Sequence, residues 1–201
     1  MKKYFVIVIT LFLIFSSGIT QAITLENLQQ QFSQNKVVRA DFKQDRFING
    51  LSHPLHSTGK MIISQQDGLW WQQLSPFKMT LKMNQVRMEQ NIDGGTPQII
   101  TAENQPQLFQ FNHLLSAIFT ADAQMLKNNF KLTLTEHDKQ WNLTLIPISA
   151  PLNKIFKQIQ LSGNVYLEKI TLDDMQNDKT EITFFNHKTT KLTQHEQSLF
   201  K

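Results

Sequence analysis

Apolar and polar residues alternate along most of the chain, which is the period expected of half-buried β-strands. The clearest stretch runs from Phe77 to Met83, where every second residue is apolar and Lys78, Thr80 and Lys82 lie between. Short turns separate the alternating stretches, so we predict sequential hairpins and an antiparallel sheet. The stretches assigned to strands are residues 38–43, 60–64, 69–74, 77–83, 86–92, 130–134, 141–145, 156–161, 165–172 and 181–185.

Helical spacing of apolar residues interrupts this pattern at a few places. Residues 25–32 predict a short amphipathic helix with Thr24 as its N-cap. Residues 108–119 predict a longer, apolar helix, and turns or short helices are expected around 125–126 and 151–156. The segment past residue 189 is interpreted as a polar tail.

These elements predict a mainly β (α+β) fold made of a single domain. We expect one curved antiparallel sheet of about 10–11 strands, forming an incomplete barrel with helices on one face as a lid. A curved sheet whose concave face is covered by helices either packs a core there or encloses a ligand.

The first residues have the composition of a secretory signal peptide. Two lysines are followed by an apolar run at residues 4–15 and by a small residue, Ala22, at the expected cleavage point. The run is shorter than the roughly 20 residues that span a bilayer. We therefore predict a signal peptide at residues 1–22 and a mature domain at residues 23–201, with a retained membrane anchor as the alternative.

Composition narrows the function classes. The chain has no cysteine, so it has neither a disulfide nor an acceptor for lipidation at a mature N-terminus. The net charge of +4 includes two leader lysines, and no run of basic residues suggests binding to nucleic acid. Fifteen Phe against two Tyr indicate either a large core or an apolar cavity lined by rings that need no hydrogen-bond partner.

Catalytic motifs are missing from the sequence. It has no Gly-x-Ser-x-Gly elbow, no Cys nucleophile and no His-Glu-x-x-His. His53 and His56 are interpreted as solvated loop residues, and Asp173 and Asp174 as turn residues because neighbours in a strand point to opposite faces. We therefore predict neither an enzyme nor a bound cofactor or metal.

A family resemblance rests on short motifs in the first half of the chain. Residues 38–44, Val-Arg-Ala-Asp-Phe-Lys-Gln, resemble the small-x-Phe-x-Gln first-strand motif of LolA-type outer-membrane lipoprotein carriers. Gly59, Leu69, Trp71 and Pro76 follow at the spacing that those carriers use for a Gly-led strand, an aromatic strand and a closing proline.

The resemblance implies a monomeric periplasmic shuttle of a Gram-negative bacterium. Such a carrier accepts an acylated lipoprotein, or another lipid, from an inner-membrane transporter and passes it to an outer-membrane receptor without covalent chemistry. The cargo would occupy a hydrophobic cavity under the helical lid, although each lining residue has an ordinary core role as its alternative. The residues expected to line the cavity are Leu28, Phe32, Phe42, Leu69, Trp71, Met79, Leu81, Leu114, Leu115, Ile118, Phe119 and Trp141.

One departure from the family pattern concerns the cargo. Lipoprotein carriers of this type have a basic residue followed by proline between the Gly-led and aromatic strands, and the arginine is thought to lock the lid. This chain has Gln65 and Gln66 there, and a side-chain amide cannot form the paired, charge-assisted hydrogen bonds of an arginine guanidinium. The cargo is thus either lipoproteins in general or one dedicated lipid, such as a polyene or a glycolipid. A lipid-binding sensor on the same half-barrel is the alternative to a transporter.

Overall fold

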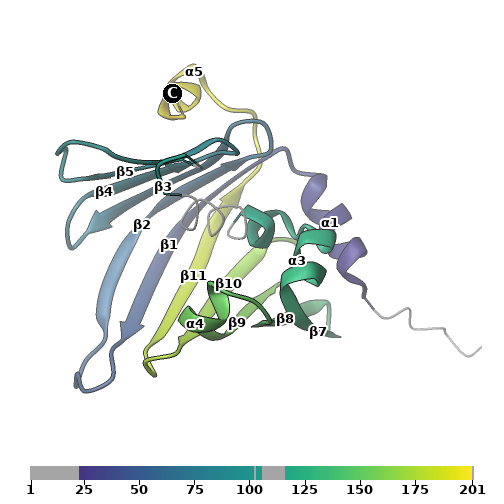
Figure 1. The fold of residues 1–201 in the computed structure, drawn as a ribbon. Coiled ribbons are helices and arrows are strands. Elements are labelled where there is room, and N and C mark those ends of the chain that lie inside the picture. The colour runs from purple at the N-terminus through teal and green to yellow at the C-terminus, as the bar shows by residue number, and fades with distance from the viewer. Residues whose placement is uncertain (1–22, 102, 106–115, 201) are drawn as a thin grey trace, which may run out of the picture.

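The chain folds into one curved sheet with helices packed against it (Figure 1). The computed structural model describes residues 23–101, 103–105 and 116–200, and a helical stretch at residues 116–120 precedes α3. The elements are α1 (Leu25–Ser33), β1 (Val37–Phe47), β2 (Leu55–Ser64), β3 (Gly68–Ser75), β4 (Met79–Met83), β5 (Arg87–Ile92), β6 (Gln98–Thr101), α3 (Ala123–Asn129), β7 (Phe130–His137), β8 (Gln140–Pro147), α4 (Leu152–Ile155), β9 (Phe156–Gly163), β10 (Leu167–Asp174), β11 (Lys179–Lys188) and α5 (Gln194–Leu199).

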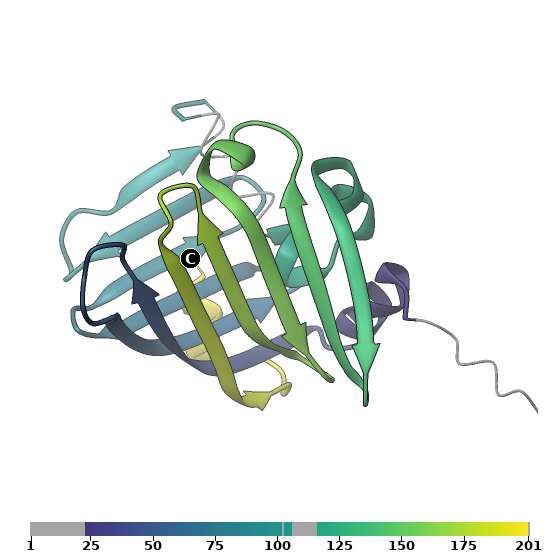
Figure 2. The same cartoon turned by 90° about the horizontal axis from the view of Figure 1, so that it is seen from below.

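The eleven strands of the described residues form one antiparallel sheet in the order β6-β5-β4-β3-β2-β1-β11-β10-β9-β8-β7. The first strand, β1, lies at its centre because it pairs with β2 on one side and with β11 on the other. No pairing joins β6 to β7 within the described residues, so the sheet curves without closing (Figure 2). The predicted mainly β fold with an incomplete barrel is confirmed.

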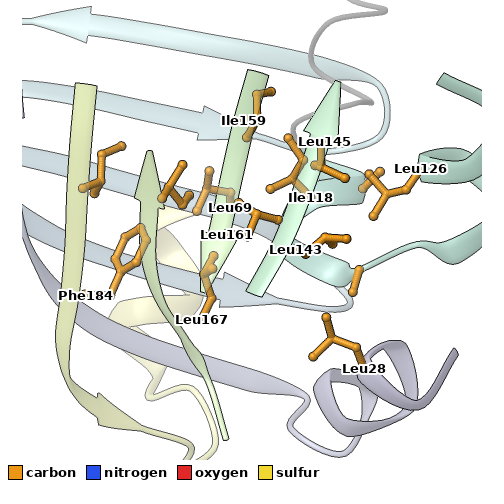
Figure 3. Close-up of a cluster of buried hydrophobic side chains, with 14 of the residues drawn as sticks. Leu28, Leu69, Ile118, Leu126, Leu143, Leu145, Ile159, Leu161, Leu167 and Phe184 are labelled. Atoms are coloured by element: carbon orange, nitrogen blue, oxygen red, sulfur yellow. The ribbon is translucent and has the colours of Figure 1, made fainter. Parts of the chain in front are cut away.

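The hydrophobic core fills the concave face of the sheet. Alternate residues of β8 and β9 face α1, α3 and the helical stretch at 116–120, as Figure 3 shows for Leu145, Ile159 and Leu126. Burial of such a side chain contributes about 1.5–3 kcal/mol, and the chain has no cysteine to add a disulfide to this contribution.

A stacked pair of rings lies at the centre of the core. Phe42 of β1 and Trp71 of β3 stack with ring centroids 3.8 Å apart, across the intervening strand β2. Gly59, which pairs with Phe42, makes room for them, because a Cβ there would lie 2.5 Å from the Phe42 ring and 2.0 Å from the Gln72 carbonyl oxygen. The three motif residues therefore form one packing unit.

The expectation that all helices lie on one face is wrong. Ile62 and Trp70 are only 5% and 7% exposed, yet they face away from the concave core. The C-terminal helix α5 lies over this convex side, where Leu199 and Glu196 border the same depression as Ile62 and Trp70. The segment past residue 189 is thus partly helical and packed against the sheet.

Other element boundaries also differ from the sequence expectation. The strand β2 begins at Leu55 rather than at residue 60, so His56 is a strand residue. The strand β6 was not expected, and α4 and the Thr24 cap of α1 agree with the prediction. The predicted leader and most of the predicted helix at 108–119 lie outside the described residues.

Candidate functional site

An apolar cavity of about 240 Å³ lies beside the end of α1. The C-terminal turn of α1, the first residues of β1 and the end of β2 form one side. The helical stretch at 116–120 and the start of β10 form the other. The lining residues described are Gln29, Phe32, Ser33, Asn35, Val38, Ile63, Gln65, Phe119, Thr120, Val165, Tyr166 and Leu167.

The wall of this cavity is built from side chains at the edge of the core. Phe32 packs edge-on against the buried Trp141, with ring centroids 5.7 Å apart. Phe119 is edge-on to Phe184 at 6.4 Å, and Leu167 is buried beneath the opening. These rings and branched chains offer dispersion contacts and no hydrogen bonds, which suits an aliphatic ligand.

The rim of the cavity is fixed by amide hydrogen bonds to backbone carbonyls. The Gln65 side chain donates to the Ser33 carbonyl oxygen at 3.0 Å, at the end of α1. Gln31 of the same helix donates to the carbonyl oxygens of Asn164 and Val165, at 2.6 and 3.0 Å. The end of α1 is therefore attached to the β2–β3 turn on one side and to the β9–β10 turn on the other.

A second depression, of about 490 Å³, continues from the cavity. The two share Ile63, Gln65, Phe119 and Thr120, and the second extends to the turn at residues 84–86 between β4 and β5. The first volume alone is slightly below the roughly 300–1,000 Å³ that holds small-molecule ligands. With its extension, the site has room for an elongated ligand.

Charge is absent from the lining of the first cavity. All twelve described residues that line it are uncharged, and its polar groups are amides and hydroxyls. Such a site favours neutral, apolar groups, because an ion brought there would lose its hydration without a partner.

In the described part of the chain no three His, Cys, Asp or Glu residues approach closely enough to hold a metal ion. His56 lies 2.6 Å from Asp45 in a solvent-exposed pair.

The residues predicted to line a cavity fall into four groups. Phe32 and Phe119 do border it. Met79 and Leu81 are partly buried and pack against the concave core. Leu114 and Leu115 lie outside the described residues. The others belong to the buried core, and of these only Leu69 also borders the second depression: Leu28, Phe42, Leu69, Trp71, Ile118 and Trp141.

Sequence reasoning missed several cavity residues because they lie at the ends of elements. Val38 and Ile63 pair across β1 and β2, whereas Tyr166 comes from the β9–β10 turn more than a hundred residues away. Only the curvature of the sheet brings these segments together. Gln65 is the exception, because it occupies the position at which lipoprotein carriers have a basic residue, and the sequence alone therefore drew attention to it.

A family model described as "Outer membrane lipoprotein carrier protein LolA-like" matches residues 17–178. The chain belongs to this LolA-like family. The family is described as one of lipoprotein carriers, and the curved, unclosed sheet described above is consistent with a binding protein of that class.

Solved structures also resemble the chain. A LolA superfamily protein from Nitrosomonas europaea is 8% identical over 90% of this chain and 98% of its own, with a TM-score of 0.47. A DUF1329 family protein from Desulfovibrio piger is 9% identical over 88% of this chain and 94% of its own, with a TM-score of 0.48. No curated protein matches the chain.

The helices of the described residues are too short or too polar to cross a membrane.

Proposed function

We propose that this LolA-like protein carries the acyl chains of a lipoprotein, or of a related lipid, from the inner to the outer membrane. In this proposal residues 1–22 direct export, and residues 23–201 act in the periplasm of a Gram-negative bacterium. An inner-membrane transporter supplies the cargo and an outer-membrane receptor takes it. The carrier performs no covalent chemistry.

The uncharged cavity beside α1 carries the proposal. Each methylene that leaves water contributes about 0.8 kcal/mol, so a long acyl chain in water costs on the order of 10 kcal/mol. A diffusing carrier lowers this cost by covering the chain with apolar side chains. Phe32, Val38 and Phe119 offer such a surface at the edge of an already packed core.

The contacts at the end of α1 also support the release step of this proposal. The hydrogen bonds that the side-chain amides of Gln31 and Gln65 donate to backbone carbonyls are neutral and solvent-exposed, so each contributes only about 0.5–1.5 kcal/mol. Small movements of α1 would open the cavity at a cost that binding to a receptor can supply. A charge-assisted arginine contact would hold the end of α1 more firmly.

The test is to purify the protein from the periplasm and to identify its cargo by mass spectrometry. An acylated protein supports the lipoprotein route, and a free lipid supports a carrier of one dedicated lipid. A Val38→Glu variant, which places a charge in the cavity, should be recovered without cargo. Recovery of equal cargo from this variant, or of none from the wild type, would contradict the proposal.

A further inference from the structure

Exposed apolar side chains concentrate at one end of the sheet. Because all neighbouring strands are antiparallel, the β1–β2, β3–β4, β5–β6, β8–β9 and β10–β11 connections meet at the same end, called here the hairpin end. Of the thirteen exposed large hydrophobic residues described, Val86 and Val165 lie at the opposite end. The other eleven lie at or near the hairpin end.

Five of these side chains surround the central strands and form what we call the apolar rim. Phe47, Leu51 and Leu55 come from the β1–β2 hairpin, Ile155 from the end of α4 and Met175 from the β10–β11 turn. Figure 1 shows both turns at the lower edge of the molecule, away from α1. Leu51, Leu55 and Met175 are 55%, 51% and 50% exposed, and exposed apolar side chains that gather on one surface mark interaction sites.

Hydrogen bonds hold the turns of the apolar rim in place. The buried carboxylate of Asp178 accepts from the Asn49 backbone N–H at 2.9 Å and pairs with Arg46 at 3.3 Å, which joins the β1–β2 hairpin to the β10–β11 turn. The Met175 N–H donates to the Ile155 carbonyl oxygen at 2.9 Å. The apolar side chains are thus presented on a connected framework rather than on a free tail.

The charged side chains beside the apolar rim differ in whether they have charged or hydrogen-bonding partners. The Asp178 carboxylate is used within the framework, and Asp174 accepts the N–H groups of Gln176 and Asp178. Lys154 has no acidic partner among the described contacts, and Lys157 donates to the neutral side chain of Asn177. Two lysines therefore stand beside the apolar side chains without a carboxylate partner, whereas Asp174 and Asp178 accept hydrogen bonds within the framework. The exposed Asp45 of β1 lies 2.6 Å from His56.

From this arrangement we infer that the apolar rim docks the protein on an anionic lipid bilayer. Single apolar side chains on neighbouring turns can each enter the interfacial region of a membrane, and adjacent lysines add attraction to anionic headgroups. The cavity beside α1 lies at the other end of the strands and stays accessible in such a complex. The rim thus gives the carrier a membrane contact that is separate from its cargo site.

Vesicle binding of the purified, cargo-free protein tests this inference. The wild type should sediment with vesicles of phosphatidylethanolamine and phosphatidylglycerol, and less with phosphatidylcholine vesicles. The double variant Leu51→Ser with Met175→Ser should bind the anionic vesicles at least about tenfold more weakly. The matched control is Val86→Ser, which removes an exposed apolar side chain at the opposite end and should leave binding unchanged.

Two further measurements separate rim docking from cargo binding. Lys154→Glu should weaken binding to anionic vesicles more than binding to neutral ones. The rim variants should retain wild-type affinity for a soluble fluorescent fatty acid, because that probe needs only the cavity. Failure of the wild type to bind anionic vesicles would overturn the inference, as would equal loss in Val86→Ser or full binding by the rim double variant.

Discussion

Arg39 of β1 and Glu196 of α5 form a bidentate ion pair on the convex face of the sheet. The Nε and Nη2 atoms of Arg39 donate to the two Glu196 carboxylate oxygens at 2.5 and 2.7 Å. The same guanidinium also donates to the carbonyl oxygens of Thr190 and Lys191, at 2.7 and 2.9 Å. One side chain of the central strand thereby fixes the whole C-terminal segment over Ile62 and Trp70.

Removal of the arginine should release α5. In Arg39→Ala we expect faster amide hydrogen exchange across residues 193–199 and a loss of about 1–3 kcal/mol in the free energy of unfolding, because charged hydrogen bonds at a partly buried site are broken. Glu26→Gln is the control, since its pair with Lys127 is solvent-exposed and its loss should leave both the unfolding free energy and the exchange in α5 close to those of the wild type. Unchanged exchange in α5 would show that the contact does not hold the helix.

Acid should loosen the same contact. Hydrogen bonds from Arg39 hold the pKa of Glu196 at about 2, below its ordinary value of 4.5. A lowered folded-state pKa stabilises the protein fully above pH 4.5, and this contribution is lost as the pH falls toward 2.

The pH effect is measured as the difference in unfolding free energy between wild type and Glu196→Gln. The wild type should be the more stable protein at pH 6, and the difference should shrink between pH 4.5 and 2. Carboxylates common to both proteins cancel in this comparison. A difference that stays constant over this range would contradict the account.

Gly59 should tolerate no side chain. A methyl group at this position would overlap the Gln72 carbonyl oxygen and the Phe42 ring, so Gly59→Ala must displace the Phe42–Trp71 stack. We expect a loss of about 2–4 kcal/mol in unfolding free energy, measured by urea denaturation. Thr58→Ala, an exposed neighbour in β2, should cost less than about 1 kcal/mol; similar losses in both variants would argue against the close approach.

Gln65 should control release more than stability. Gln65→Leu keeps a similar volume and removes the donor to the Ser33 carbonyl at the end of α1. The dissociation rate of a bound fluorescent fatty acid should rise about fivefold, while the unfolding free energy changes by less than about 1 kcal/mol. Stopped-flow displacement measures this rate, and an unchanged rate would assign Gln65 no part in holding the cavity closed.

The sheet was predictable from sequence because its concave face alone is apolar over long stretches. The period of two in β8 reflects side chains that alternate between core and solvent. The convex helix was missed, although residues 61–63 and 69–71 contain unbroken apolar runs. Such runs indicate strands buried on both faces. The runs do not say which element covers the second face. In the structure α5 lies over Ile62 and Trp70 there.

The candidate site was less predictable for a physical reason. Hydrophobicity alone does not distinguish a packed ring from one that borders a cavity, and Phe42 and Phe32 have the same side chain. Phe42 lies at the middle of the central strand and is fully covered, whereas Phe32 lies at the end of α1 beside an opening. The difference depends on long-range sheet curvature, which no local pattern records.

The central claim is that the cavity beside α1 holds an acyl chain, and Phe119→Asp tests it most directly. The measurement is the affinity for a fluorescent fatty acid, with far-UV circular dichroism as the check on folding. The matched control, Phe77→Asp, places the same charge at an exposed phenylalanine of the hairpin end. Thr120→Trp, which fills the cavity without adding a charge, serves if Phe119→Asp does not fold. We predict that the wild type and Phe77→Asp bind the probe and that the folded cavity variants do not. Wild-type affinity in a folded cavity variant would contradict the account.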